Sequence, residues 1–502
     1  MPPTIPDELI QLITDNLAQE TREGRAEDLL SCSLAHNALR HAAQKHLFET
    51  VQLWTSPPSL QDPPPYQAAL DARALLFVQL LKKNPALGLH VRRLDYQVNQ
   101  FPRNDEDRLD DLLQAIEMMP NVTDLTLGYR RIVVPWTEGR RMPMAPIPRE
   151  LVFQNRKGTS GEDPHSRWKR AVVALIQRTQ LKTLRLAKIR MLPLYSLSPS
   201  IRNLYLQDSS FSLGRPLEPF ENRCVKLESL NCEDDEAVNF VDDYLKAEEV
   251  GLPLPVTLDL SGLRRLGITA LCGYHERWGR VLRRVGHLCE LEVLVHRLGS
   301  LITEEAKPEI ALEGFSTNPV SLIHPASLAT ISHLTLKIYT DHRYSYSIVD
   351  PYTRACDDSL LLLGALEILE IEMTLDGGEC ALHTDNLTGI GHGWERLPVI
   401  LVTHGSFPRL RKVSVPVQTT MEDHSEHALE GLDAEENEER KGEVEARLAY
   451  AQKLVEEMAD LVFPQTEFRS VVNARPGLKL SLVTEVTMGY ETWRCRANIV
   501  SK

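Results

Sequence analysis

The chain has 502 residues, of which 42% are hydrophobic and 25% charged, and a formal net charge of −14 at pH 7. This length allows a large core and predicts about three domains, unless a repeat array lets the chain grow without splitting. The negative charge argues against nucleic acid as the main partner, because phosphate binding relies on a basic surface.

The cysteines and the apolar runs indicate the class of protein. The eight cysteines include no CxxC pair and fit neither a zinc site nor a disulfide scaffold. We therefore expect reduced thiols and a cytoplasmic or nuclear location. The first basic residue is Arg22, which argues against a secretory leader. The apolar run at 360–366 is far shorter than the roughly 20 residues of a membrane helix.

The first predicted element is a helix in IPDELIQLITDNL, residues 5–17. Its apolar residues at helical spacing are Leu9, Leu12, Ile13 and Leu17. Ile10 points away from this stripe, so apolar side chains occupy more of the circumference than one packed face needs. The pattern predicts two burial surfaces, one inside the protein and one for a partner.

Helical spacing resumes over residues 29–53, so we expect about three helices in a module at 1–53. The motifs are Ile-Pro-x-Glu-Leu at 5–9, Ile13, Leu17, Leu-Leu-Ser-Cys-Ser-Leu at 29–34 and His-Leu-Phe at 46–48. Together they resemble an F-box of the kind found in fungal F-box domain-containing proteins.

The resemblance implies a docking role. In that family the helices bind the Skp adaptor subunit of a cullin–RING ubiquitin ligase, and the rest of the chain selects the substrate. Carried over position by position, the Skp-binding residues are Pro6, Leu9, Ile13, Leu17, Leu29, Leu30 and Leu34. The alternative is that the helices only cap the domain that follows, as terminal repeats do in solenoids.

A proline-rich linker is expected at 54–70, and a repeated strand pattern follows over 71–420. The predicted strands are VRRLDYQV (91–98), VTDLTL (122–127), LKTLRL (181–186), IRNLYL (201–206), LESLNC (227–232), LRRLGI (263–268), LEVLVH (291–296), ISHLTLKI (331–338), LEILEI (366–371) and LRKVSV (410–415). Their central leucines are Leu94, Leu125, Leu184, Leu204, Leu230, Leu266, Leu294, Leu334 and Leu369.

Helical stretches separate several of these strands, so the pattern is typical of an irregular leucine-rich-repeat-like α/β solenoid with a parallel sheet. One strand–helix unit cannot bury its apolar face alone, and stacked neighbours create a continuous core. One or two ordinary α/β domains with a parallel sheet would show the same alternation.

Three further segments have distinct compositions. A basic insert at 128–170 carries ten Lys or Arg against four acidic residues. It suits either a loop that binds an acidic or phosphorylated segment or a solvated loop. An acidic segment at 421–446 is predicted to be disordered. Residues 447–502 are expected to form a helix and a closing strand near 479–486.

No motif indicates catalysis. The segment 383–405 has three histidines and the run GIGHG, but its spacing matches neither a zinc site nor a phosphate-binding loop. We therefore expect a non-enzymatic adaptor without metal or cofactor, which links a protein substrate to a Skp subunit and through it to a cullin. The alternatives are a repeat scaffold with no ligase role and an enzyme whose site is assembled from the inserts.

Overall fold

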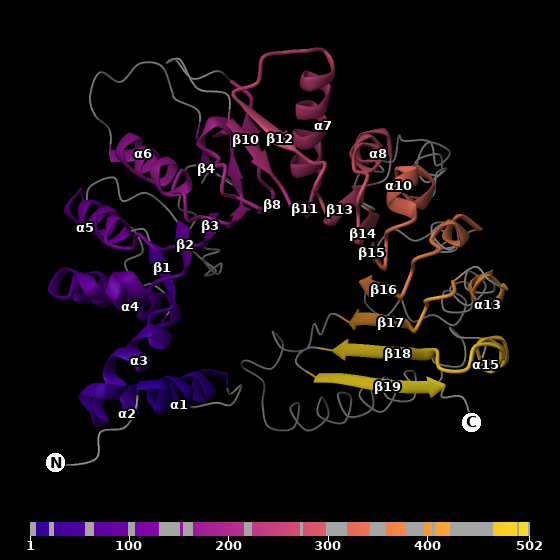
Figure 1. Ribbon diagram of the computed structural model, residues 1–502, viewed down its shortest axis with the longest axis horizontal. Coiled ribbons are helices and arrows are strands. Elements are labelled where there is room, and N and C mark those ends of the chain that lie inside the picture. Colours follow the sequence, from indigo (N-terminus) through magenta and orange to yellow (C-terminus); the bar gives the residue numbers. More distant parts are fainter. Residues whose placement is uncertain are drawn as a thin grey trace, which may run out of the picture. The chain divides into compact units, whose positions relative to one another are not determined.

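The computed structural model shows a mixed α/β protein built around parallel strands (Figure 1). The structure describes residues 7–19, 25–55, 65–98, 106–129, 151–153, 164–214, 223–271, 275–297, 319–341, 358–376, 396–403, 407–421, 465–488 and 491–499. The chain divides into two units, and each is described by itself. The first unit comprises Met1–Leu227 with Val250–Asp259, and the second comprises Glu228–Glu249 with Leu260–Lys502.

The first unit begins with helices α1 (Asp7–Gln19), α2 (Arg25–Ala35) and α3 (Asn37–Leu47). The helix expected to run to residue 53 ends at Leu47, and strand β1 (Thr50–Thr55) follows it. This part of the prediction is wrong because TVQLWT alternates in burial, with Val51 and Leu53 buried. Such a two-residue period is that of a strand.

The sheet of the first unit has the order β1-β2-β3-β5-β8. Its further strands are β2 (Arg93–Val98), β3 (Asp124–Tyr129), β5 (Thr183–Ala187) and β8 (Asn203–Gln207), all parallel. Helices α4 (Pro65–Lys83), α5 (Glu106–Glu117) and α6 (Pro164–Ile176) lie on one side of β1–β3 (Figure 1). Three short strand pairs complete the unit. They are β4 (Leu151–Val152) with β6 (Ile189–Arg190), β7 (Leu192–Pro193) with β9 (Phe211–Ser212), and β10 (Arg223–Lys226) with β12 (Val256–Asp259).

The second unit has a sheet in the order β11-β13-β14-β15-β16-β17-β18-β19. Its strands are β11 (Ser229–Cys232), β13 (Arg265–Leu271), β14 (Glu290–Arg297), β15 (His333–Asp341), β16 (Ile368–Asp376), β17 (Lys412–Met421), β18 (Lys479–Met488) and β19 (Glu491–Ile499). Its helices are α7 (Asp235–Glu249), α8 (His275–Arg284), α10 (Pro325–Leu328), α13 (Arg396–Val402) and α15 (Gln465–Ala474). The last strand pairs antiparallel with β18.

One row of buried side chains crosses each sheet. In the first unit, the paired residues are Val51, Leu94, Leu125, Leu184 and Leu204. In the second unit, they are Leu230, Leu266, Leu291, Leu334, Leu369, Val413 and Leu480. All of these side chains are at most 6% exposed, so they form the core beneath the helices. Apolar side chains at every second position explain why one face of each sheet is buried.

The register corrects one of the predicted central leucines. Leu291, and not Leu294, pairs with Leu266 and Leu334. Leu294 instead pairs with Thr269 and Lys337, so it lies on the opposite face of the sheet. The sequence LEVLVH contains leucines three residues apart, and only strand pairing decides which one joins the core row.

The predicted strands are confirmed at every position, with their starts shifted by no more than a few residues. Strands β1 and β19 and the short strands β4, β6, β7, β9, β10 and β12 were not expected. The acidic segment 421–446, apart from Met421, and the predicted helix at 447–463 lie outside the described residues. So do most of the basic insert 128–170 and of the histidine-containing segment 383–405. Among the described residues, no helix combines the length and the apolar character needed to cross a membrane.

Candidate functional site

The three N-terminal helices pack through small and medium-sized side chains. Ile10 and Thr14 of α1, Leu29 of α2, and Ala42 and Ala43 of α3 are buried. The Thr14 hydroxyl donates a hydrogen bond to the carbonyl oxygen of Ile10 at 3.0 Å, so its burial leaves no unpaired donor. The side of α1 that faces its own bundle is thus the side of Ile10, which lies away from the predicted leucine stripe.

The stripe itself remains uncovered. Five large apolar side chains of α1 and α2 are between 45% and 74% exposed: Leu9, Leu12, Ile13, Leu30 and Leu34. We call these five residues the N-terminal apolar surface. Single exposed leucines are ordinary on proteins, but several on two adjacent helices are typical of an interaction surface.

The residues predicted to bind a Skp subunit fall into four groups. Leu9, Ile13, Leu30 and Leu34 belong to the N-terminal apolar surface, and Leu17 is half-buried. Leu29 is 1% exposed and packs within the bundle. Pro6 lies outside the described residues. Leu12 was not predicted as a site residue, although its helical spacing to Leu9 could have identified it.

A polar contact holds α1 against α3. His46 Nε2 lies 2.7 Å from Asp15 Oδ1, and Gln11 Nε2 donates to the same oxygen at 2.5 Å. Burial alone would raise the pKa of Asp15, but the hydrogen bonds from Gln11 and His46 outweigh it and hold this pKa below its usual value. The contact ties α1 to α3 within the bundle.

The face of the first sheet opposite its core row carries polar side chains. Arg185 of β5 and Tyr205 of β8 are paired in register, and the Arg185 guanidinium carbon lies 4.2 Å from the centre of the Tyr205 ring. Gln97 lies beside Gly128 of the next strand, where a Cβ atom would overlap the Gln97 amide. Gly128 thus leaves room for the flexible Gln97 side chain against the neighbouring strand.

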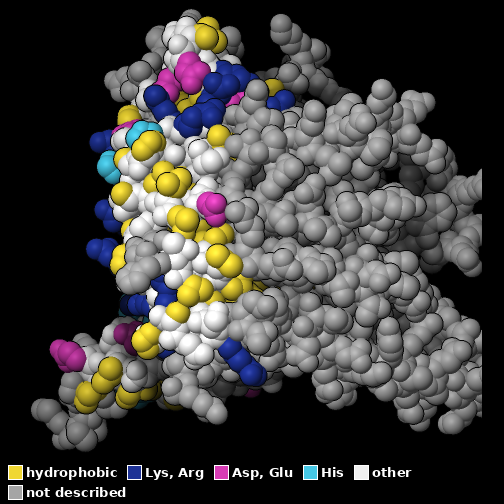
Figure 2. Space-filling model, turned by 90° about the vertical axis from the view of Figure 1, so that its right-hand side faces the viewer, with side chains coloured by type: hydrophobic (Ala, Val, Ile, Leu, Met, Phe, Trp, Pro, Cys, Tyr) yellow, Lys and Arg dark blue, Asp and Glu magenta, His cyan; other side chains and the backbone are white. Residues whose placement is uncertain are grey.

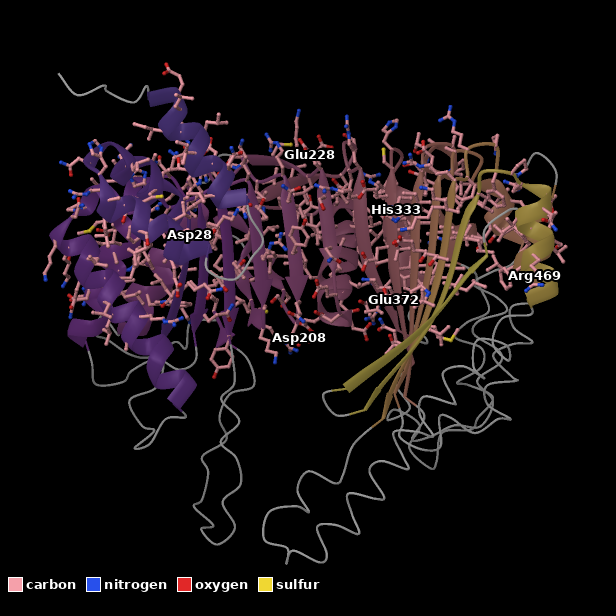
Figure 3. The ribbon with its side chains drawn as sticks, turned by 90° about the horizontal axis from the view of Figure 1, so that it is seen from below. Asp28, Asp208, Glu228, His333, Glu372 and Arg469 are labelled. Carbon is pink, nitrogen blue, oxygen red and sulfur yellow. The ribbon has the colours of Figure 1, made fainter. Side chains whose placement is uncertain are left out.

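The corresponding face of the second sheet carries charges that pair with one another. Lys412 Nζ lies 2.6 Å from Glu370 Oε1, and His333 Nε2 lies 3.4 Å from Glu370 Oε2. Lys337 Nζ lies 2.8 Å from Glu292 Oε1 and 3.9 Å from Glu372 Oε2. Figure 3 shows His333 and Glu372 at different levels along these strands.

The pKa shifts follow from these pairs. The hydrogen bond to Glu292 is the main reason that the pKa of Lys337 is raised, and burial opposes it. Burial tends to raise the pKa of Glu370, but the hydrogen bond and charge of Lys412, aided by His333, hold it below its usual value. Both shifts favour the charged forms, so the groups act as ion pairs rather than as proton donors or acceptors at neutral pH.

A third feature is the helical side of the second unit. Figure 2 looks onto the side that carries α8, α10, α13 and α15, where hydrophobic side chains gather near groups of Lys and Arg. Leu362 and Val399, which are 54% and 67% exposed, contribute apolar surface in this unit. No group of His, Cys, Asp and Glu within the described part of the chain is arranged to hold a metal ion.

Comparison with known proteins adds little to this geometry. No protein-family model and no curated protein matches the chain. Among solved structures, the chain is similar to the crystal structure of a protein from Bacteroides fragilis, with 12% sequence identity and a TM-score of 0.26. The match covers 72% of this chain and 80% of the other.

Proposed function

We propose that the protein is a non-enzymatic substrate-recognition adaptor of a Skp–cullin–F-box type ubiquitin ligase. The observation that carries the proposal is the N-terminal apolar surface. The F-box-like motif assigns a docking role to these helices, and four of its predicted contact residues are exposed: Leu9, Ile13, Leu30 and Leu34. A Skp-type subunit is the partner that would cover them.

The energetics favour such an interface. Burial of one large aliphatic side chain contributes about 1.5–3 kcal/mol. The N-terminal apolar surface offers five of them on two helices whose own bundle is already packed. A few well-buried side chains commonly provide most of the binding energy of an interface.

In this proposal, the remaining strands and helices form a leucine-rich-repeat-like solenoid that holds a protein substrate on the polar side of its strands. The chain itself contributes binding, and the ligase subunits act on the substrate because it is held close to them. Such an adaptor would operate in the cytoplasm, the nucleus or both, bound through the Skp-type subunit to a cullin.

The test is binding of the full chain to a purified Skp-type adaptor subunit, measured by isothermal titration calorimetry. We expect Leu9→Asp/Ile13→Asp to weaken binding at least about a hundredfold, because two buried apolar contacts are replaced by two desolvated carboxylates. Circular dichroism should show unchanged helix content, since both side chains are about half exposed, at 49% and 45%.

A matched control is Leu76→Asp/Leu80→Asp on α4. These leucines are also about half exposed, at 59% and 45%, so the substitution makes the same chemical change outside the N-terminal helices. The control should bind like the unmodified chain. Absence of binding by the unmodified, folded chain would reject the ligase role and favour the scaffold alternative.

A further inference from the structure

The Arg185 side chain is a cation that stacks on the Tyr205 ring instead of pairing with a carboxylate. The guanidinium lies over the Tyr205 ring at 4.2 Å, and Arg185 remains exposed. Within the described residues, it forms no ion pair. Stacking on an aromatic ring restrains the planar guanidinium while leaving its N–H donors free for a carboxylate, which it binds through two parallel hydrogen bonds.

Neighbouring side chains on the same face also offer free donors. Thr126 pairs in register with Arg185, and Arg93 lies on β2, two strands from β5. In the part of the chain that the structure describes, neither Thr126 nor Arg93 has a side-chain hydrogen bond or an ion pair. This face therefore presents two guanidinium groups and a hydroxyl that are available to an incoming ligand.

The carboxylates of this face each accept a hydrogen bond from a neighbouring side chain. Asp95 Oδ1 accepts a hydrogen bond from Gln97 Nε2 at 2.7 Å, and Asp124 Oδ2 accepts one from the Thr123 hydroxyl at 2.7 Å. The second sheet differs, because Lys337 and Lys412 are paired with Glu292 and Glu370. The face of the first sheet thus offers the guanidinium donors of Arg185 and Arg93 to an anionic ligand, with Asp124 paired in register with Arg93 and Asp95 in the same row as Arg185.

We propose that this face binds an extended acidic segment of a partner protein, with one carboxylate on Arg185 and a second on Arg93. Strands lie about 4.8 Å apart and residues about 3.3 Å apart along a strand, so the two arginine positions are separated by about 12 Å. An extended peptide covers this distance in three to four residues. The segment therefore carries Asp or Glu three or four positions apart.

The charge of the whole protein makes this proposal testable. A net charge of −14 repels acidic peptides, so non-specific attraction does not produce binding. Only a local site can overcome this repulsion. Identification of the segment as a substrate rests on the proposed function, whereas binding itself does not require a ligase.

The experiment measures fluorescence anisotropy of the full chain with a labelled decapeptide of Gly and Ser that carries Glu at positions 4 and 7. We expect saturable binding that Arg185→Ala weakens at least about tenfold. Arg185→Lys should also weaken binding several-fold, because lysine keeps the charge but loses the planar, bidentate group. The peptide with Gln at both positions should bind no better than the Arg185→Ala variant binds the acidic peptide.

Arg73→Ala is the matched control, since Arg73 is an exposed arginine on α4 with no ion pair within the described residues. It removes the same charge and should leave peptide affinity unchanged. Equal affinity of the Glu and Gln peptides, or equal loss in Arg73→Ala and Arg185→Ala, would overturn the proposal. The same Arg185→Ala chain should still bind the Skp-type subunit normally, so failure of this proposal is distinguishable from failure of the ligase role.

Discussion

Asp235 is a residue whose charged form reduces the stability of the folded protein. It lies in the first turn of α7, where Asp234 already accepts a hydrogen bond from the Ala237 N–H at 2.9 Å. Burial and then the charge of Asp234 raise the pKa of Asp235 to about 6, although Arg277 opposes this shift. An acidic group near a helix N-terminus normally stabilises the helix, but here one carboxylate already provides the cap.

The raised pKa predicts that Asp235→Asn increases the free energy of unfolding by an amount that depends on pH. Between pH 4 and 6 the native state holds a proton that the unfolded state has lost, so this group reduces stability as the pH rises through that window. We expect the variant to gain about 1 kcal/mol in free energy of unfolding at pH 7.5, after a discount for solvent screening at a half-buried site. The gain should shrink as the pH approaches 4.

Urea unfolding at pH 4.5 and pH 7.5 measures this difference. Asp243→Asn is the control, because Asp243 lies on the same helix but its side chain is 67% exposed. Its effect on the free energy of unfolding at pH 7.5 should be smaller than that of Asp235→Asn, because this side chain lies largely in water. A gain for Asp235→Asn that is equal at both pH values would contradict the assignment.

Among the elements, the close approach of η1 (Pro85–His90) to the end of α5 depends on one glycine. A Cβ atom at Gly88 would overlap the backbone carbonyl oxygen of Met118. Backbone atoms cannot rotate away as a side chain does, so the two segments would have to separate. Buried residues on both sides, Leu87 and Met119, would then lose packing.

We therefore expect Gly88→Ala to lower the free energy of unfolding by about 2 kcal/mol, which is within the range for overpacked sites. Thermal or urea unfolding of the full chain measures the change. Gly364→Ala is the control, because a Cβ atom there meets nothing within 4 Å. Equal stability of the Gly88→Ala and Gly364→Ala variants would show that the approach of η1 to α5 is looser than described.

At the scale of the whole molecule, each strand in the core rows pairs with no more than two neighbouring strands. Leu334 pairs with Leu291 on one side and Leu369 on the other, and all three are at most 2% exposed. In a repeat array, as in the proposed solenoid, stability would be close to a sum of local terms and nearest-neighbour contacts. A substitution that destabilises one strand should therefore reduce the stability of the adjacent strands most.

Leu334→Ala tests this expectation. Removal of a fully buried leucine costs about 2–5 kcal/mol. We expect hydrogen exchange, read by mass spectrometry, to accelerate most in β14, β15 and β16 and least in β18. Uniform acceleration across all strands of the second unit would instead indicate that the unit unfolds in one cooperative step.

The sequence predicted the strands well and the helix–strand junction after α3 poorly. A strand with one buried face repeats every two residues, and this period is visible without knowledge of any partner. The apolar positions in residues 48–53 fit the helical period of about 3.6 residues as well as the strand period of two. The predicted helix was therefore extended into β1. The antiparallel strand β19 lacks the leucine pattern that identified the others, because it closes the sheet rather than repeating within it.

Docking at the N-terminal helices stays a prediction. Four of the seven residues predicted to bind a Skp subunit are exposed, whereas Leu29 packs inside the bundle. The pair Arg185–Tyr205 could not be found by sequence inspection. The two residues are twenty positions apart, and their contact depends on the register between β5 and β8.

The sequence by itself determined the alternation of helices and parallel strands and the amphipathic character of α1, because local periodicity reports which side chains must leave water. Only the tertiary structure decided which side of α1 is buried, which leucine of β14 joins the core row and which charged groups remain free. These outcomes depend on pairing between distant segments. A shift of one residue in that pairing would exchange the two faces of a strand without any change in its sequence.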